Sequence, residues 1–141
     1  MLQRFIWLAM SAGLAAGMGN AQSNTSAPTA LKQTSAANGK QMYLSYCASC
    51  HGADGKGDGP VAASLKMPPT DLTLLNKNNN GNFPDRHVFA VLQYGAEIPS
   101  HGTPEMPVWG PILGKLDKAN PDVKELRISN LIRYLESIQA N

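Results

Sequence analysis

The sequence predicts an all-α domain of about four or five helices that are joined by long loops. Residues 84–95 and 120–138 carry apolar side chains with the 3.6-residue period of a helix. No stretch alternates apolar and polar residues as a half-buried strand does. The 13 glycines and 10 prolines fall largely between the apolar stretches and indicate loops. A length of 141 residues fits one such domain.

The N-terminal segment, residues 1–21, is predicted to be a signal peptide. Arg4 precedes an apolar run over residues 5–18, and small residues end the segment at Ala21. The run is shorter than the roughly 20 apolar residues that a membrane-spanning helix needs. We therefore expect cleavage near Ala21 and a soluble mature protein in the periplasm of a bacterium, with an uncleaved membrane anchor as the alternative.

The next stretch, residues 22–34, is rich in Ser, Thr, Asn and Ala and is expected to be a flexible leader. The folded domain is therefore expected at 35–141. The formal net charge of the sequence is only +2. This near-neutral balance argues against nucleic acid as a partner, because that function needs a dense basic face.

The first helix of the domain is expected over residues 36–50. The residues that share its apolar face are Met42, Tyr43, Tyr46 and Cys47. Four glycines and a proline in residues 52–60 end this helix. Glycine permits a close approach of the backbone, so this loop is expected to wrap tightly around something.

The later elements follow from turn and cap signals. A short helical turn over 61–66 ends at two prolines, and a polar loop covers 77–82. A helix begins at the Pro-Asp pair of 84–95 and ends at its glycine. A second long loop covers 96–120, and the last helix, within 120–138, has an asparagine cap and a proline in its first turn.

The most informative motif is Cys47-Ala48-Ser49-Cys50-His51, because C-x-x-C-H is the attachment signature of a c-type haem. On a helical turn the two thiols share a face, so both can form thioethers to one haem edge. His51 then follows as the proximal iron ligand. A structural zinc site would need four ligands, and a redox dithiol would need a βαβ context. A simple disulfide of an exported protein is the third alternative.

Two stretches resemble the monohaem class I cytochromes c of bacteria. Residues 39–59 begin with G-K-Q-M-Y-L-S-Y-C-A-S-C-H-G and lead into G-D-G-P at 57–60, and residues 88–111 contain H-G-T-P-E-M-P-V-W-G-P. The resemblance implies the cytochrome c fold, with helices and long loops wrapped around one covalently attached haem c and its iron. It also implies that Met106, in the M-P-x-W-G pattern, is the distal iron ligand.

The resemblance implies further contacts around the haem. A carbonyl at Gly59-Pro60 would accept the second N–H of His51. Trp109 would pack on the haem or bond a propionate, with a buried core position as its alternative. A glycine-and-aromatic contact between the terminal helices would involve three residues: Gly39, Tyr43 and Tyr134.

Other residues compete with Met106 as the sixth iron ligand. Met67 also precedes a proline, but it follows His51 closely and is expected on the histidine side of the haem. His101 would give a bis-histidine site instead. Met42 lies upstream of the cysteines, and His87 is expected to be solvated near a helix start.

Two axial ligands leave no open position on the iron, so the sequence favours one-electron transfer and no catalytic residue is predicted. The expected function is a soluble periplasmic carrier. It would accept electrons from a quinol:cytochrome c reductase or a periplasmic dehydrogenase and donate them to an oxidase or reductase. The alternatives are a haem enzyme or ligand-binding protein with a labile sixth position, and a dedicated cytochrome subunit of a larger oxidoreductase.

Overall fold

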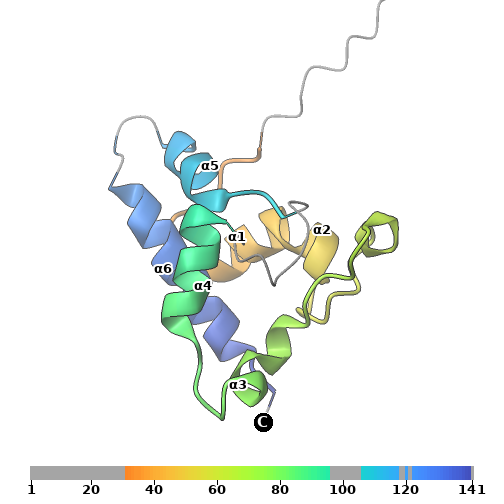
Figure 1. Cartoon of the computed structure of the whole chain (residues 1–141). Coiled ribbons are helices and arrows are strands. Elements are labelled where there is room, and N and C mark those ends of the chain that lie inside the picture. Colours follow the sequence, from red (N-terminus) through yellow and green to blue (C-terminus); the bar gives the residue numbers. More distant parts are fainter. Residues whose placement is uncertain (1–30, 96–105, 118–119, 121, 141) are drawn as a thin grey trace, which may run out of the picture.

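A computed structural model describes residues 31–95, 106–117, 120 and 122–140. These residues form six α-helices and two short 3₁₀ helices, and no strand occurs among them. The all-α prediction is therefore confirmed (Figure 1). The predicted signal peptide, residues 1–21, lies outside the described residues.

The helices follow one another along the chain with loops of different lengths between them. In order they are α1 (Gly39–Tyr46), α2 (Ala48–His51), η1 (Ala62–Ser64), η2 (Leu72–Leu74), α3 (Leu75–Asn78), α4 (Asp85–Tyr94), α5 (Trp109–Lys115) and α6 (Val123–Ser137). The helix expected over 36–50 is thus two helices that meet at Cys47. Its start is set by Asn38, whose side chain accepts a hydrogen bond from the backbone N–H of Gln41.

Helix α5 was not predicted, because its seven residues include two glycines and a proline. Pro111 stands in the first turn, where a missing N–H costs no helical hydrogen bond. Burial of Trp109 and Leu113 stabilises the helix in spite of its composition. Tertiary packing therefore outweighs local propensity in this part of the region expected as a loop.

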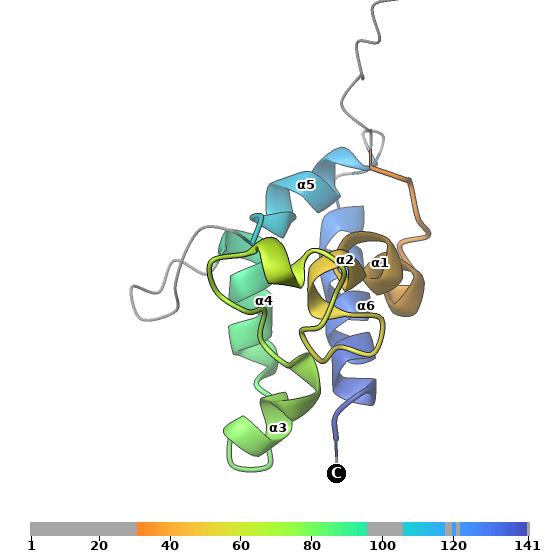
Figure 2. The ribbon, with the colours of Figure 1, turned by 90° about the vertical axis from the view of Figure 1, so that its right-hand side faces the viewer.

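The two terminal helices, α1 and α6, cross at a glycine (Figure 2). A Cβ added to Gly39 would collide with the Asn130 carbonyl. Next to this contact the rings of Tyr43 and Tyr134 lie 5.2 Å apart between centroids, at an angle of 47°. The predicted glycine-and-aromatic crossing is confirmed.

The hydrophobic core lies among α1, α4, α5 and α6. Its buried members are Met42, Tyr43, Tyr46, Val88, Leu92, Trp109, Leu113, Ile128, Leu131 and Leu135. Helix α4 ends at Gly95, as predicted, with a φ of 90° that favours glycine. Among the helices that the structure describes, none combines the length and apolarity that crossing a membrane requires.

Candidate cofactor site

The C-x-x-C-H residues form one compact turn. Cys47 lies between α1 and α2, and its carbonyl accepts hydrogen bonds from the backbone N–H of Cys50 (3.1 Å) and of His51 (2.9 Å). Both cysteines are free, half-buried thiols. Burial raises the pKa of the Cys47 thiol to about 12, and proximity to Cys50 adds to the effect. Cys47 is therefore held as the neutral thiol, and Cys50 and His51 follow it on the same short turn.

His51 is oriented by a backbone carbonyl. Its Nδ1 lies 3.0 Å from the carbonyl oxygen of Thr70. A carbonyl only accepts, so Nδ1 carries the proton and Nε2 remains as the nitrogen that can bind a metal. Burial lowers the pKa of His51, while the bond to Thr70 acts in the opposite direction. The net effect favours the neutral imidazole, which is the form that ligates metals.

The acceptor for His51 differs from the one expected, since Thr70 and not Pro60 supplies it. Residues on either side of Pro60 bond back to the haem-motif turn. The N–H of Gly59 donates to the Cys50 carbonyl at 3.0 Å, and the N–H of Val61 donates to the Ser49 carbonyl at 3.0 Å. The loop containing Pro60 is thereby closed on α2, and the carbonyl opposite the imidazole comes from the following segment.

Glycines in residues 52–60 bring that segment into place. A Cβ on Gly57, which has a φ of 83°, would collide with the Pro69 carbonyl. Close by, the carbonyl of Gly55 accepts a hydrogen bond of 2.7 Å from the N–H of Leu72. The glycine-rich loop therefore packs tightly against the residues on both sides of Thr70, and this close approach sets the position of its carbonyl.

The predicted distal ligand lies on the segment that leads into α5. Met106 is half-buried and packs against the core. Three residues later Trp109, only 7% exposed, lies over the ring of Tyr46 with 5.9 Å between the ring centroids and 30° between their planes. Trp109 is therefore a buried core residue, which was the alternative expected for it. Its contact with a haem, and ligation by Met106, stay predictions.

The competing ligands occupy different environments. Met42 is fully buried, and its sulfur lies 3.7 Å from Nη1 of Arg127 within the core. Met67 is 56% exposed, and His87 is exposed on α4. His101 lies outside the described residues. Met42 is thereby poorly placed to bind the same iron as His51. For Met67, His87 and His101, iron ligation is not decided by the structure.

The donor set suits a covalently attached haem. Two free thiols and one oriented imidazole share a turn, and large apolar side chains on other segments remain exposed. Those side chains include Met67, Phe89, Tyr94 and Val108. In the part of the chain that the structure describes, no group of three or more His, Cys, Asp or Glu residues could hold a metal ion. The zinc alternative therefore lacks its ligands there, while the thiol and imidazole chemistry fits haem.

Comparison with known proteins agrees with this chemistry. Residues 34–120 match the family model described as "Cytochrome C oxidase, cbb3-type, subunit III". The chain belongs to this family. It is a c-type cytochrome, and its family implies a covalently attached haem c with iron. The matched residues include the whole C-x-x-C-H turn, Thr70 and the Met106 segment, defined here as residues 106–108.

One curated relative of this cytochrome is the "Cbb3-type cytochrome c oxidase subunit FixP" of Sinorhizobium medicae (strain WSM419). It is 36% identical over 90 residues, which are 64% of this chain and 25% of the relative. The cytochrome thus spans about a quarter of that relative's length. No solved structure matches it.

Sequence reasoning missed two features of the site. The first is Thr70. The two prolines before it could have indicated this role, because they favour an extended backbone at this point of the chain. The second is the set of hydrogen bonds between Tyr46, Thr34 and Arg127. No local motif marks these bonds, since they join residues that are up to 93 positions apart.

Proposed function

We propose that this cytochrome is a dedicated electron-transfer subunit that delivers electrons to a terminal oxidase of the cbb3 type. The observation that carries the proposal is the family match over residues 34–120, which contains the C-x-x-C-H turn and the carbonyl that orients His51. The sequence had favoured a freely diffusing carrier. The comparisons support the alternative of a dedicated subunit better, because the matched family and the relative are both oxidase subunits.

Each residue of the site has a defined task in this proposal. Cys47 and Cys50 hold the haem through thioethers, and His51 binds the iron through Nε2 while Nδ1 donates to Thr70. Met106 would supply a thioether as the second iron ligand, which favours the reduced state relative to a second histidine. The bound haem supplies a one-electron couple between ferric and ferrous iron.

A closed site makes the protein an electron-transfer component without catalytic residues of its own. If His51 and Met106 both bind the iron, they would leave no coordination position for a substrate. A haem enzyme would need an open position and a distal acid or base, and the histidine nearest to Met106 in sequence is His101. The geometry of His51 prepares one iron ligand in either case, and the closed site depends on Met106 as the second.

The proposed surroundings follow from the sequence and the relative. The apolar segment before Ala21 supports export, so we place the domain in the periplasm. There it would accept electrons from a quinol:cytochrome c reductase or a periplasmic dehydrogenase. The oxidase would be the acceptor.

The test is isolation of the tagged holoprotein from detergent-solubilised membranes of its own source. We expect it to co-purify with a terminal oxidase and, once reduced, to be oxidised by that enzyme in the presence of oxygen. A Cys47→Ala, Cys50→Ala double variant, which cannot hold haem covalently, is the control for electron delivery. Recovery only from the soluble fraction, without an oxidase, would support the carrier instead. Rapid binding of carbon monoxide to the ferrous protein would support the haem enzyme.

A further inference from the structure

We propose that Tyr46 is a positioning residue, through which the N-terminal segment, residues 32–36, holds the Met106 segment in place for ligation. The inference rests on the proposed function, because it assumes that Met106 binds the iron. Tyr46 directly precedes Cys47 and stacks on Trp109. One side chain thereby joins the turn that carries the haem to the segment that closes its far side.

Hydrogen bonds fix the hydroxyl of Tyr46 to the N-terminal segment. The hydroxyl donates to the carbonyl of Lys32 at 2.6 Å. It also lies 2.8 Å from Oγ1 of Thr34, a residue that is only 5% exposed. Both partners belong to the N-terminal segment, so the hydroxyl is fixed to that segment at two points.

The direction of each bond follows from the number of protons available. Tyr46 has one hydroxyl proton, which goes to the Lys32 carbonyl, so Thr34 must donate to the Tyr46 oxygen. Thr34 Oγ1 in turn accepts from Nη1 of Arg127 at 3.3 Å. The bonds thus run in one direction, from Arg127 through Thr34 and Tyr46 to Lys32, an arrangement in which each bond polarises the next.

Arg127 makes this network costly to open. Its side chain is 2% exposed, and no carboxylate pairs with it among the residues that the structure describes. Nη1 also donates to the backbone carbonyl of Thr34 at 2.9 Å, while Nε has no partner. Release of the N-terminal segment would leave a buried guanidinium without its oxygen acceptors. The segment is therefore held as a fixed part of the domain.

The contact between Tyr46 and Trp109 carries this rigidity to the Met106 segment. Trp109 begins α5, and a Cβ on the following Gly110 would collide with the Gln93 carbonyl of α4. A Cβ on Gly95 would lie 2.9 Å from Cγ2 of Val108. Helix α4 therefore supports the Met106 segment on one side, and Tyr46 supports it from the side of the haem-bearing turn.

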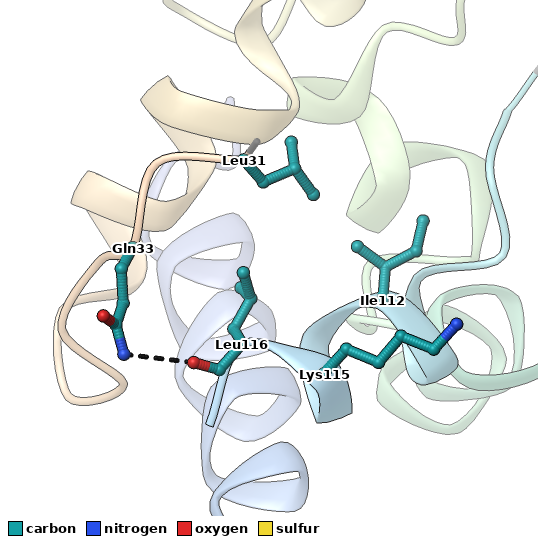
Figure 3. A pocket seen from close by; sticks show the side chains of 5 residues that line it. All are labelled: Leu31, Gln33, Ile112, Lys115 and Leu116. Carbon is teal, nitrogen blue, oxygen red and sulfur yellow. Dashed lines mark hydrogen bonds between the residues drawn. The ribbon is translucent and has the colours of Figure 1, made fainter. Parts of the chain in front are cut away.

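The N-terminal segment also contacts the other end of α5. Nε2 of Gln33 donates to the carbonyl of Leu116 at 3.0 Å, as Figure 3 shows. Gln33 lies beside a hollow of about 370 Å³, whose lining is mainly apolar. The N-terminal segment thus contacts both ends of α5. It reaches Trp109 at the start through the ring of Tyr46, and Leu116 at the end through Gln33.

The experiment compares displacement of the methionine ligand in single variants of the holoprotein. Tyr46→Phe keeps the ring and removes its two hydrogen bonds, and Thr34→Val removes the donor to Tyr46. Each variant should keep the near-red ferric absorption of iron–methionine ligation. Thr34→Val should let added imidazole displace the ligand about fivefold faster, the factor that corresponds to one lost hydrogen bond. Tyr46→Phe, which loses two bonds, should accelerate the displacement by about fivefold or more.

The matched control is Asn130→Ala. Nδ2 of Asn130 donates to the carbonyl of Ala36 at 2.9 Å, so it ties the same segment to α6 without touching Tyr46 or Trp109. This variant should unfold at lower denaturant concentration, with imidazole displacement unchanged. Equal displacement rates in all three variants and the wild type would overturn the role of Tyr46.

A failure of the proposed ligation would look different. If the wild-type protein lacks the near-red absorption, or if Met106→Ala retains it, Met106 is not the ligand. Both the closed site and the role of Tyr46 would then be refuted. A wild-type band that is lost in Met106→Ala, together with unchanged displacement in Tyr46→Phe, refutes the role of Tyr46 alone.

Discussion

The crossing of α1 and α6 offers a sharp test of the fold through one methyl group. In a Gly39→Ala variant the new Cβ would collide with the carbonyl of Asn130 and lie 3.0 Å from Cβ of Tyr134. The first of these contacts is with helix backbone, which cannot turn aside as a flexible side chain can. The two helices must therefore move apart, and the neighbouring contact between Tyr43 and Tyr134 must loosen with them.

The expected cost comes from two opposing effects. Overpacking of a close contact destabilises a protein by about 1–3 kcal/mol. Replacement of glycine by alanine in a helix interior stabilises it by about 1 kcal/mol, and the gain is smaller at Gly39 because it begins α1. We expect the free energy of unfolding of Gly39→Ala to fall by roughly 1–2 kcal/mol.

A matched substitution separates the collision from the change in helix propensity. Gly114 lies inside α5, and a Cβ there would meet only the side chain of Lys124, at 3.5 Å. Gly114→Ala should therefore leave stability unchanged or raise it by a few tenths of a kcal/mol, up to about 1 kcal/mol. Guanidinium unfolding of both holoproteins, followed by haem absorption, measures the difference. Equal or greater stability of Gly39→Ala would refute the close crossing.

Three further predictions concern the site. Met106→Ala should abolish the near-red ferric absorption and Met67→Ala should preserve it; the reverse would move the distal ligand to Met67. Gly57→Ala should disturb the Pro69–Thr70 backbone and weaken the hydrogen bond from His51 to the Thr70 carbonyl, and the reduction potential should rise as a result. An unchanged potential in a redox titration would contradict this role of the loop. Tyr43→Phe should lower the free energy of unfolding by about 1–2 kcal/mol, since the hydroxyl donates to the Gly52 carbonyl at 2.7 Å. Burial raises the pKa of Tyr43 above its ordinary value of 10. The contribution of its hydroxyl to the free energy of unfolding is therefore complete below pH 10 and declines above it. A difference in stability between the wild type and Tyr43→Phe that stays constant from pH 8 to 11.5 would argue against this burial.

The sequence predicted the features that depend on local signals. The haem-motif turn and the end of α4 at Gly95 follow from residue types at short spacing, whereas the glycine at the helix crossing was predicted from the resemblance to class I cytochromes c. The end of α4 is clear because a positive φ almost requires glycine there. The same reasoning missed α5, whose glycines and proline disfavour a helix until Trp109 and Leu113 are buried.

The parts of the site that could not be predicted depend on contacts between distant segments. The carbonyl that orients His51 was expected at Pro60, because the resemblance to class I cytochromes c implied a proline carbonyl after the motif. The loop instead closes on α2, and Thr70 reaches the imidazole from 19 residues away. Backbone carbonyls carry no sequence signal of their own, since every residue has one.

The two halves of the proposed site depend on tertiary structure to different degrees. Cys47, Cys50 and His51 share a single turn in which the N–H groups of Cys50 and His51 bond to the Cys47 carbonyl. Met106 comes from a segment with no such turn, and its position depends on α4, on Tyr46 and on the N-terminal segment behind Tyr46. Partial unfolding should therefore release the methionine before the histidine. Because a thioether favours ferrous iron, loss of these tertiary contacts would lower the reduction potential while the haem stays attached.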